Sequence, residues 1–167
     1  MNEYSFVSQK NETEVKKMAK PYYIEDLNEW KEGFKYRYPI RVRFSETDAF
    51  GHLNNTVSFV YFELGRINFF KDSGMTGEWF SSDGKTIPVT GDLHCDYFKQ
   101  VFFDEELDVC VKVAEIGTTS VDLHYMIVNK NDDICMTGRG KIVQVSRDSG
   151  KPKPWSESGR QFLEKGM

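Results

Sequence analysis

The chain has 167 residues, of which 39% are apolar, 14% aromatic and 29% charged. This length and composition are typical of one globular domain, and they exclude collagen-like repeats and extensive disorder. The 22 basic and 26 acidic side chains give a net charge of -4 without a basic run, so no nucleic-acid partner is expected. No apolar stretch approaches the ~20 residues of a membrane span, and residues 1–20 lack a signal-peptide core.

The cysteines indicate the redox state of the compartment in which the protein is found. Cys95, Cys110 and Cys135 are odd in number and irregularly spaced, which argues against a disulfide framework or a zinc site. Their pattern favours a reducing compartment. We therefore expect a cytoplasmic enzyme or binding domain, without a membrane partner and without a metal site.

The first part of the chain is polar and lacks a sustained period. A short helix is expected over Glu12–Lys20. It is expected to end before Pro21, because a proline disfavours helix in the residue before it. Trp30, Phe34 and two neighbouring tyrosines indicate that the later half of this extension packs on the body. We assign residues 1–38 to an N-terminal extension, 39–147 to the main domain and 148–167 to a C-terminal tail.

Alternating apolar and polar residues predict five strands. In the first, Ile40, Val42 and Phe44 alternate with polar side chains, as in a strand with one buried face. Four more alternating stretches follow, at about 87–98, 106–115, 120–129 and 134–146. Short polar connections between the last three predict hairpins, and the four strands are interpreted as an antiparallel meander.

A single long helix is predicted between the first strand and the other four. Asn55–Lys71 contains no proline and is apolar nearly all round, so it is expected to be buried, and Gly74 is expected to end it in a left-handed conformation. A sheet with one buried face needs a cover, and this helix is the one candidate. The prediction is an α+β fold in which the sheet curls around the helix.

The turn that leads into this helix carries the candidate chemistry. Asp48 lies close to the helix N-terminus, where unpaired backbone N–H groups and the helix dipole favour negative charge, including an oxyanion formed during acyl transfer. Asp48 is therefore the candidate base or nucleophile. The spacing alone favours a structural turn over a catalytic one, since Asp and Asn most often cap helices and Gly51 suits a tight turn.

A resemblance to a known family adds to this interpretation. The stretch that carries it is Thr47-Asp48-Ala49-Phe50-Gly51-His52-Leu53-Asn54-Asn55. It resembles the Thr-Asp-x-x-Gly-His-x-Asn-Asn signature of 4-hydroxybenzoyl-CoA thioesterase-like proteins, a branch of the hotdog superfamily. Further similarities lie in Tyr61-Phe62-Glu63, Arg66, Asp96-Tyr97-Phe98-Lys99 and Glu105-Glu106-Leu107-Asp108-Val109. The resemblance spans about residues 39–145 and implies a hotdog fold, a five-stranded antiparallel sheet wrapped around one long central helix.

The family resemblance also implies an activity and roles for residues. The protein would be an acyl-CoA thioesterase in which Asp48 attacks the thioester carbonyl or activates a water, while the backbone N–H of Asn55 polarises that carbonyl. The implied substrate-binding residues are Gly51, His52, Asn54, Tyr61, Glu63 and Lys99. No metal or organic cofactor is implied. Because the family's active sites lie at a dimer interface, a homodimer or homotetramer is implied as well.

Several alternatives stay open at this stage. The substrate could be an acyl carrier protein rather than acyl-CoA, or the chain could be a scaffold that binds an acyl thioester without hydrolysing it. Glu63 and Arg66 share a helix face, and a structural ion pair is favoured over a pocket role for Glu63. His52 is expected either to hold the loop or to contact substrate. Lys99 is a candidate for binding coenzyme A phosphates.

Overall fold

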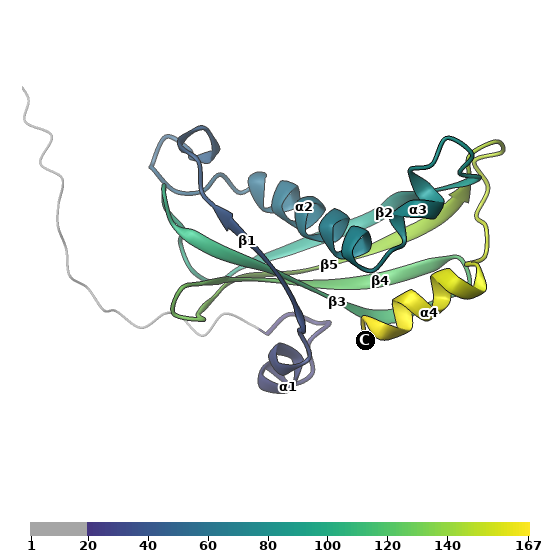
Figure 1. The fold of residues 1–167 in the computed structure, drawn as a ribbon. Helices are drawn as coiled ribbons and strands as arrows, with labels where there is room; N and C mark the ends of the chain where they lie inside the picture. Colours follow the sequence, from purple (N-terminus) through teal and green to yellow (C-terminus); the bar gives the residue numbers. More distant parts are fainter. Residues whose placement is uncertain (1–19) are drawn as a thin grey trace, which may run out of the picture.

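The computed structural model describes residues 20–167, except the side chain of Glu78. Five strands form one antiparallel sheet in the order β1-β3-β4-β5-β2, with the long helix α2 across it (Figure 1). The strands are β1 (Tyr36–Arg41), β2 (Thr86–Tyr97), β3 (Glu106–Ile116), β4 (Ser120–Asn129) and β5 (Ile134–Ser146). The helices are α1 (Leu27–Glu32), α2 (Val57–Asp72), α3 (Thr76–Trp79) and α4 (Glu157–Lys165). The predicted α+β class with five antiparallel strands is confirmed.

The four later strands lie where they were predicted, but their order differs. The hairpins β3–β4 and β4–β5 are confirmed. The prediction of a four-stranded meander is wrong, because β2 pairs with β5 and not with β3. The reason is that β1 occupies the outer edge of β3, where Tyr36 is opposite Val111, so the free edge of β5 is the one left for β2.

The first strand begins and ends earlier than predicted. It covers Tyr36–Arg41, and the chain then forms a short 3-10 turn, Phe44–Glu46. Phe44 is 76% exposed, so its alternation with Val42 does not mark a buried strand face. The strand ends because the carboxylate of Glu46 accepts a hydrogen bond from the backbone N–H of Arg43, which closes the turn.

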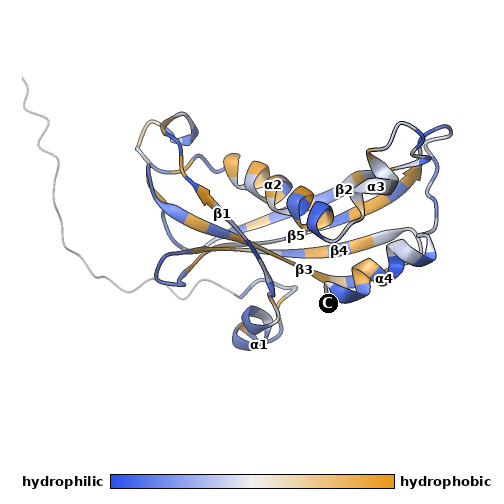
Figure 2. Cartoon of the chain, viewed as in Figure 1, coloured by the Kyte–Doolittle hydropathy of each residue, from blue (hydrophilic) through white to orange (hydrophobic). Residues whose placement is uncertain are grey.

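Helix α2 packs on one face of the sheet. Apolar residues gather along α2 and along the strands beneath it (Figure 2). Phe62 stacks on Tyr125 of β4 with ring centroids 4.7 Å apart. The approach is so close that a Cβ on Gly138 of β5 would lie 2.5 Å from the Phe62 ring and 2.7 Å from the carbonyl oxygen of His94. The left-handed glycine predicted after the helix is confirmed, since Gly74 has φ +85°.

The expectation that α2 is enclosed on every side is wrong for the single chain. Val60, Leu64 and Ile67 are 53%, 37% and 42% exposed. These three residues recur at helical spacing and form one apolar stripe on the side of α2 that no other described segment covers. We call this stripe the open face of α2.

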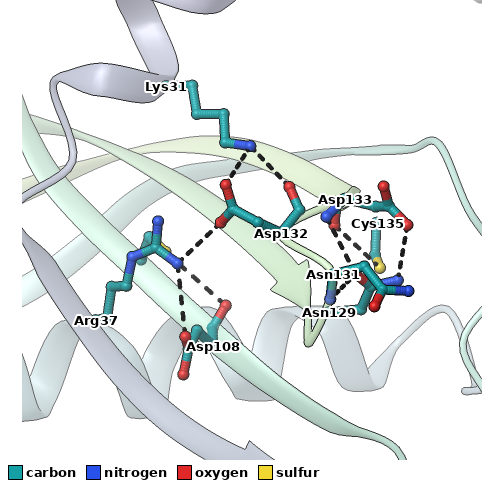
Figure 3. A network of polar contacts seen from close by, with 9 residues as sticks. Lys31, Arg37, Asp108, Asn129, Asn131, Asp132, Asp133 and Cys135 are labelled. Carbon is teal, nitrogen blue, oxygen red and sulfur yellow. Dashed lines mark hydrogen bonds and ion pairs between the residues drawn. The ribbon is translucent and has the colours of Figure 1, made fainter.

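The opposite face of the sheet is covered by residues 21–34, which we call the N-terminal strap. Trp30 and Phe34 are buried there against apolar side chains of β3 and β4, in agreement with the prediction that the later half of the extension packs on the body. Lys31 and Arg37 both bind Asp132 in the β4–β5 turn, at 2.6 and 3.0 Å (Figure 3). The helix predicted over residues 12–20 lies almost entirely outside the described residues. The division into extension, main domain and tail stays a prediction.

The strap also makes stability depend on pH through His124. The indole N–H of Trp30 donates to Nδ1 of His124 at 2.8 Å, so that nitrogen must be unprotonated. Burial lowers the pKa of His124 to about 4, below the value near 6.5 of an unfolded chain. The unfolded state therefore takes up the proton first as the pH falls, and stability is expected to fall between about pH 6.5 and pH 4.

A urea titration at pH 7 and at pH 5 measures this effect. The wild type should lose more of its free energy of unfolding between the two pH values than His124→Gln, whose amide oxygen can accept the Trp30 bond without titrating. His94→Gln serves as the matched control, because His94 is half-exposed. Equal losses in wild type and His124→Gln would contradict the prediction.

Candidate active site

The loop before α2 is held in one conformation by Asp48. Its Oδ1 accepts hydrogen bonds from the backbone N–H groups of Phe50 at 2.8 Å and His52 at 3.2 Å, and its own N–H donates to the His52 carbonyl at 2.8 Å. Gly51 takes φ +77°, which closes the turn. Among the described residues Oδ2 has no hydrogen-bond partner, so one carboxylate oxygen stays available.

The end of the same loop begins the helix. Oδ1 of Asn54 accepts from both the backbone N–H and the hydroxyl of Thr56, at 3.0 and 2.9 Å, and so satisfies one of the unpaired donors of the helix start. The Asn55 carbonyl accepts from Ser58 at 2.6 Å and from Tyr97 at 2.5 Å. The Asn55 N–H makes no hydrogen bond within residues 20–167. It is therefore free to bind an oxygen from outside the chain.

A buried carboxylate that sequence reasoning missed ties this loop to α2. Glu46 is 7% exposed and accepts hydrogen bonds from the Tyr61 hydroxyl at 2.7 Å and from the guanidinium of Arg43 at 2.6 and 3.0 Å. Burial alone would raise the pKa of Glu46, but these bonds outweigh it and hold the pKa below the usual value. The backbone carbonyl of Glu46 also accepts from Asn54 at 2.9 Å. Glu46 thus joins both ends of the loop to the helix.

Removing one of these bonds should loosen the loop. Tyr61→Phe deletes a hydrogen bond to a buried carboxylate and is expected to lower the free energy of unfolding by roughly 1–2 kcal/mol. Urea denaturation measures the loss. Tyr38→Phe is the control, since Tyr38 is half-buried and its hydroxyl makes no hydrogen bond in the described part of the chain. A Tyr61→Phe midpoint no lower than that of the control would refute this role.

The structure places the predicted substrate-binding residues in three locations. Gly51, His52 and Asn54 lie in the loop. His52 and Lys99 line one small hollow of about 220 Å³, where the His52 ring also packs edge-on against Phe102 with centroids 5.0 Å apart. Lys99 is exposed and pairs with Asp133 at 2.6 Å.

The other two predicted residues lie on α2. Tyr61 is buried with its hydroxyl on Glu46, a position that fits a role in holding the loop. Glu63 is farther along the helix and lines a separate cavity of about 550 Å³. The predicted ion pair between Glu63 and Arg66 is loose, because the two side chains approach only to 4.0 Å and Glu63 is 62% exposed.

Two features of residues 20–167 bear on partners and cofactors. None of the described helices is long and apolar enough to cross a bilayer. In the same part of the chain, no three His, Cys, Asp or Glu side chains gather as a set of metal ligands.

Comparison with known proteins identifies the family. The model of the thioesterase-like superfamily matches residues 42–163. The uncharacterised protein YsmA of Bacillus subtilis (strain 168) is 41% identical over 147 residues, which cover 87% of this chain and 97% of YsmA. The chain therefore belongs to the thioesterase-like superfamily.

Solved structures agree with this assignment. One described as a predicted thioesterase from Bacillus stearothermophilus is 30% identical, with a TM-score of 0.69, and the match covers 79% of this chain and 96% of that one. The DHNA-CoA thioesterase from Staphylococcus aureus has the same fold, with a TM-score of 0.68 at 21% identity over 77% of this chain and 88% of its own. The five-stranded sheet and α2 are thus a hotdog fold.

Proposed function

We propose that the protein is an acyl-CoA thioesterase that uses Asp48 and the backbone N–H of Asn55. The observation that carries the proposal is the pairing of two unused polar groups on one rigid loop. Oδ2 of Asp48 and the Asn55 N–H both lack partners among the described residues, while the rest of the loop is fixed by hydrogen bonds. A base and an oxyanion donor are the two groups that thioester hydrolysis requires.

The proposed reaction proceeds through a tetrahedral intermediate. Asp48 takes a proton from water as the water oxygen attacks the thioester carbonyl carbon, and the carbonyl oxygen becomes an oxyanion that accepts from the Asn55 N–H. The C–S bond then breaks, the carboxylic acid is released, and the thiolate of coenzyme A takes up the proton held by Asp48, which restores the carboxylate. In the alternative route Asp48 attacks the carbonyl carbon itself and water hydrolyses the resulting anhydride. Coenzyme A is a good leaving group in both.

A panel of acyl thioesters tests the proposal. Release of thiol is measured with short, long and aromatic acyl-CoA esters and with the same acyl groups on an acyl carrier protein. We expect turnover of at least one CoA ester. Turnover of carrier-protein esters alone would show that the substrate is an acyl carrier protein and not acyl-CoA. No turnover of any ester would mean that the protein is a scaffold that binds thioesters without hydrolysing them. A single turnover in ¹⁸O-labelled water tests for the direct route, because label in the Asp48 carboxylate can come only from an anhydride that water opened at the Asp48 carbonyl.

The open face of α2 supports a homodimer as part of the same proposal. Ile67 of the open face lines one cavity together with Ile87 and Pro88 of edge strand β2, whose outer side no described strand pairs. An unpaired edge and an exposed apolar stripe are the two features that a second copy of the chain would cover. We propose that two chains associate through this surface.

A further inference from the structure

We propose that the acyl group of the substrate carries a carboxylate, and that Arg66 binds this carboxylate in the cavity of about 550 Å³ beside the C-terminal half of α2. The inference rests on the proposed thioesterase function and names the class of substrate. It is carried by two independent observations, the shape and lining of the cavity and the missing counter-ion of Arg66.

The cavity has the size and chemistry of a small-molecule site. Its volume lies within the range of about 300–1,000 Å³ typical of ligand pockets. It is formed between α2, α3 and the edge of the sheet made by β2 and β5. Most of its wall is apolar, contributed by Ile67, Phe70, Trp79, Ile87 and Ile142. Such a wall suits an aliphatic or aromatic acyl group.

Arg66 is the buried charge in this wall. Its side chain is 10% exposed, and the guanidinium has five N–H donors. The one hydrogen bond found for it among the described side chains joins Nη1 to the Tyr125 hydroxyl at 3.3 Å. Glu63 is the only described carboxylate within reach, at 4.0 Å, and it is mostly in solvent. Arg66 is therefore a nearly buried cation without a close counter-ion.

The unused donors of Arg66 are accessible from the cavity. Every described side-chain nitrogen that is sealed from solvent has a hydrogen-bond partner, so the guanidinium nitrogens of Arg66 without a partner are in contact with solvent, and Arg66 is one of the residues that line the cavity. Arg147 adds a second positive charge at the wall while donating to the Trp79 carbonyl at 2.8 Å. A planar carboxylate is the group that a guanidinium fork binds best.

The position of Arg66 along α2 fits the far end of an acyl group. Asn55 lies two residues before Val57, the first residue of α2, and Arg66 is nine residues after Val57, which is about 13.5 Å along the helix axis. The Arg66 side chain leans back toward the N-terminus of the helix, which shortens this separation. An acyl group whose carbonyl is at Asn55 would thus place a distal carboxylate toward Arg66.

The first test compares esters that differ only at the far end. Octanoyl-CoA and suberyl-CoA have equal chain lengths, and only the second ends in a carboxylate. We expect the wild type to prefer the carboxylate ester. Arg66→Gln should lower the ratio of kcat/KM for suberyl-CoA to that for octanoyl-CoA by at least about 30-fold, as loss of a buried charge partner does. Arg66→Lys should restore part of the ratio.

A second test is independent of hydrolysis. Calorimetric titration with octanoate and with its uncharged match, octanamide, should show tighter binding of octanoate to the wild type, and Arg66→Gln should abolish the difference. Arg160→Gln on α4, an exposed arginine, is the matched control, and circular dichroism confirms the fold of each variant.

The two tests together separate the possible failures. If octanoate binds more tightly than octanamide but Arg66→Gln does not change the preference between the two esters, the cavity binds a free acid. That result overturns the assignment of the substrate. No discrimination in either test overturns the site itself, while hydrolysis of octanoyl-CoA would still support the thioesterase. If no ester is hydrolysed but octanoate still binds more tightly than octanamide, the proposed thioesterase function is overturned and Arg66 is left as an anion-binding site.

Discussion

Asp48→Asn is expected to lower kcat for thioester hydrolysis by about 10²–10⁴-fold, the usual contribution of a positioned base. Asparagine has nearly the same shape, and its side-chain oxygen can still accept the hydrogen bonds from Phe50 and His52 that hold the loop. What it lacks is an oxygen able to take a proton from water or to attack a carbonyl. The loss should therefore appear in kcat more than in KM.

The measurement is thiol release from the best acyl-CoA ester under saturating conditions. Asp148→Asn is the matched control, because Asp148 is an exposed carboxylate near the end of the sheet, away from the loop. Circular dichroism and the urea midpoint show whether Asp48→Asn remains folded. Equal kcat in wild type and Asp48→Asn would mean that the loop is a structural turn and that the reaction, if any, occurs elsewhere.

The second large effect is expected at the open face of α2. Leu64→Asp should convert a dimer into a monomer, with the dissociation constant raised at least about 100-fold, because the new carboxylate would be buried without a partner in the contact. In the single chain Leu64 is 37% exposed, so the same substitution should change the stability of the monomer little. Sedimentation velocity over a range of concentrations measures the association.

A control on another helix separates this effect from charge alone. Gln161→Asp adds the same charge to an exposed position of α4 and should leave association unchanged. Activity should fall with dimer content in Leu64→Asp if the site is completed by a second chain. A wild type that stays monomeric at micromolar concentration, or a Leu64→Asp variant that still dimerises, would show that the open face is not an interface.

The sequence predicted most of the secondary structure because the strands have one clear period. The boundaries of β3, β4 and β5 were predicted to within one residue, since their alternation stops at short polar connections. The pairing of β2 was not predictable in this way, because alternation says nothing about which neighbour a strand chooses. The exposure of Leu64 was missed for a similar reason: an apolar helix face is equally suited to a core and to a contact between chains.

The candidate site was predicted in part. Asp48 came from the position of the loop before the helix and from the family resemblance, and Asn55 came from the resemblance alone; within residues 20–167 each keeps one polar group without a partner. Glu46 was missed, although its spacing of three from Arg43 was a usable signal for a local ion pair. The Glu46 carboxylate is buried and accepts a hydrogen bond from Tyr61, fifteen residues away. This contact depends on how α2 packs on the sheet, which the sequence pattern does not give.

The N-terminal strap has a consequence for how the protein is made. Trp30 leaves the ribosome early, yet its hydrogen-bond partner His124 comes 94 residues later. At about 5–20 residues per second, synthesis of that interval takes roughly 5–19 seconds. Throughout this time the apolar side chains of the strap have no sheet to cover. The nascent chain therefore exposes this apolar segment, and completion of the fold is deferred until the last strands have been synthesised.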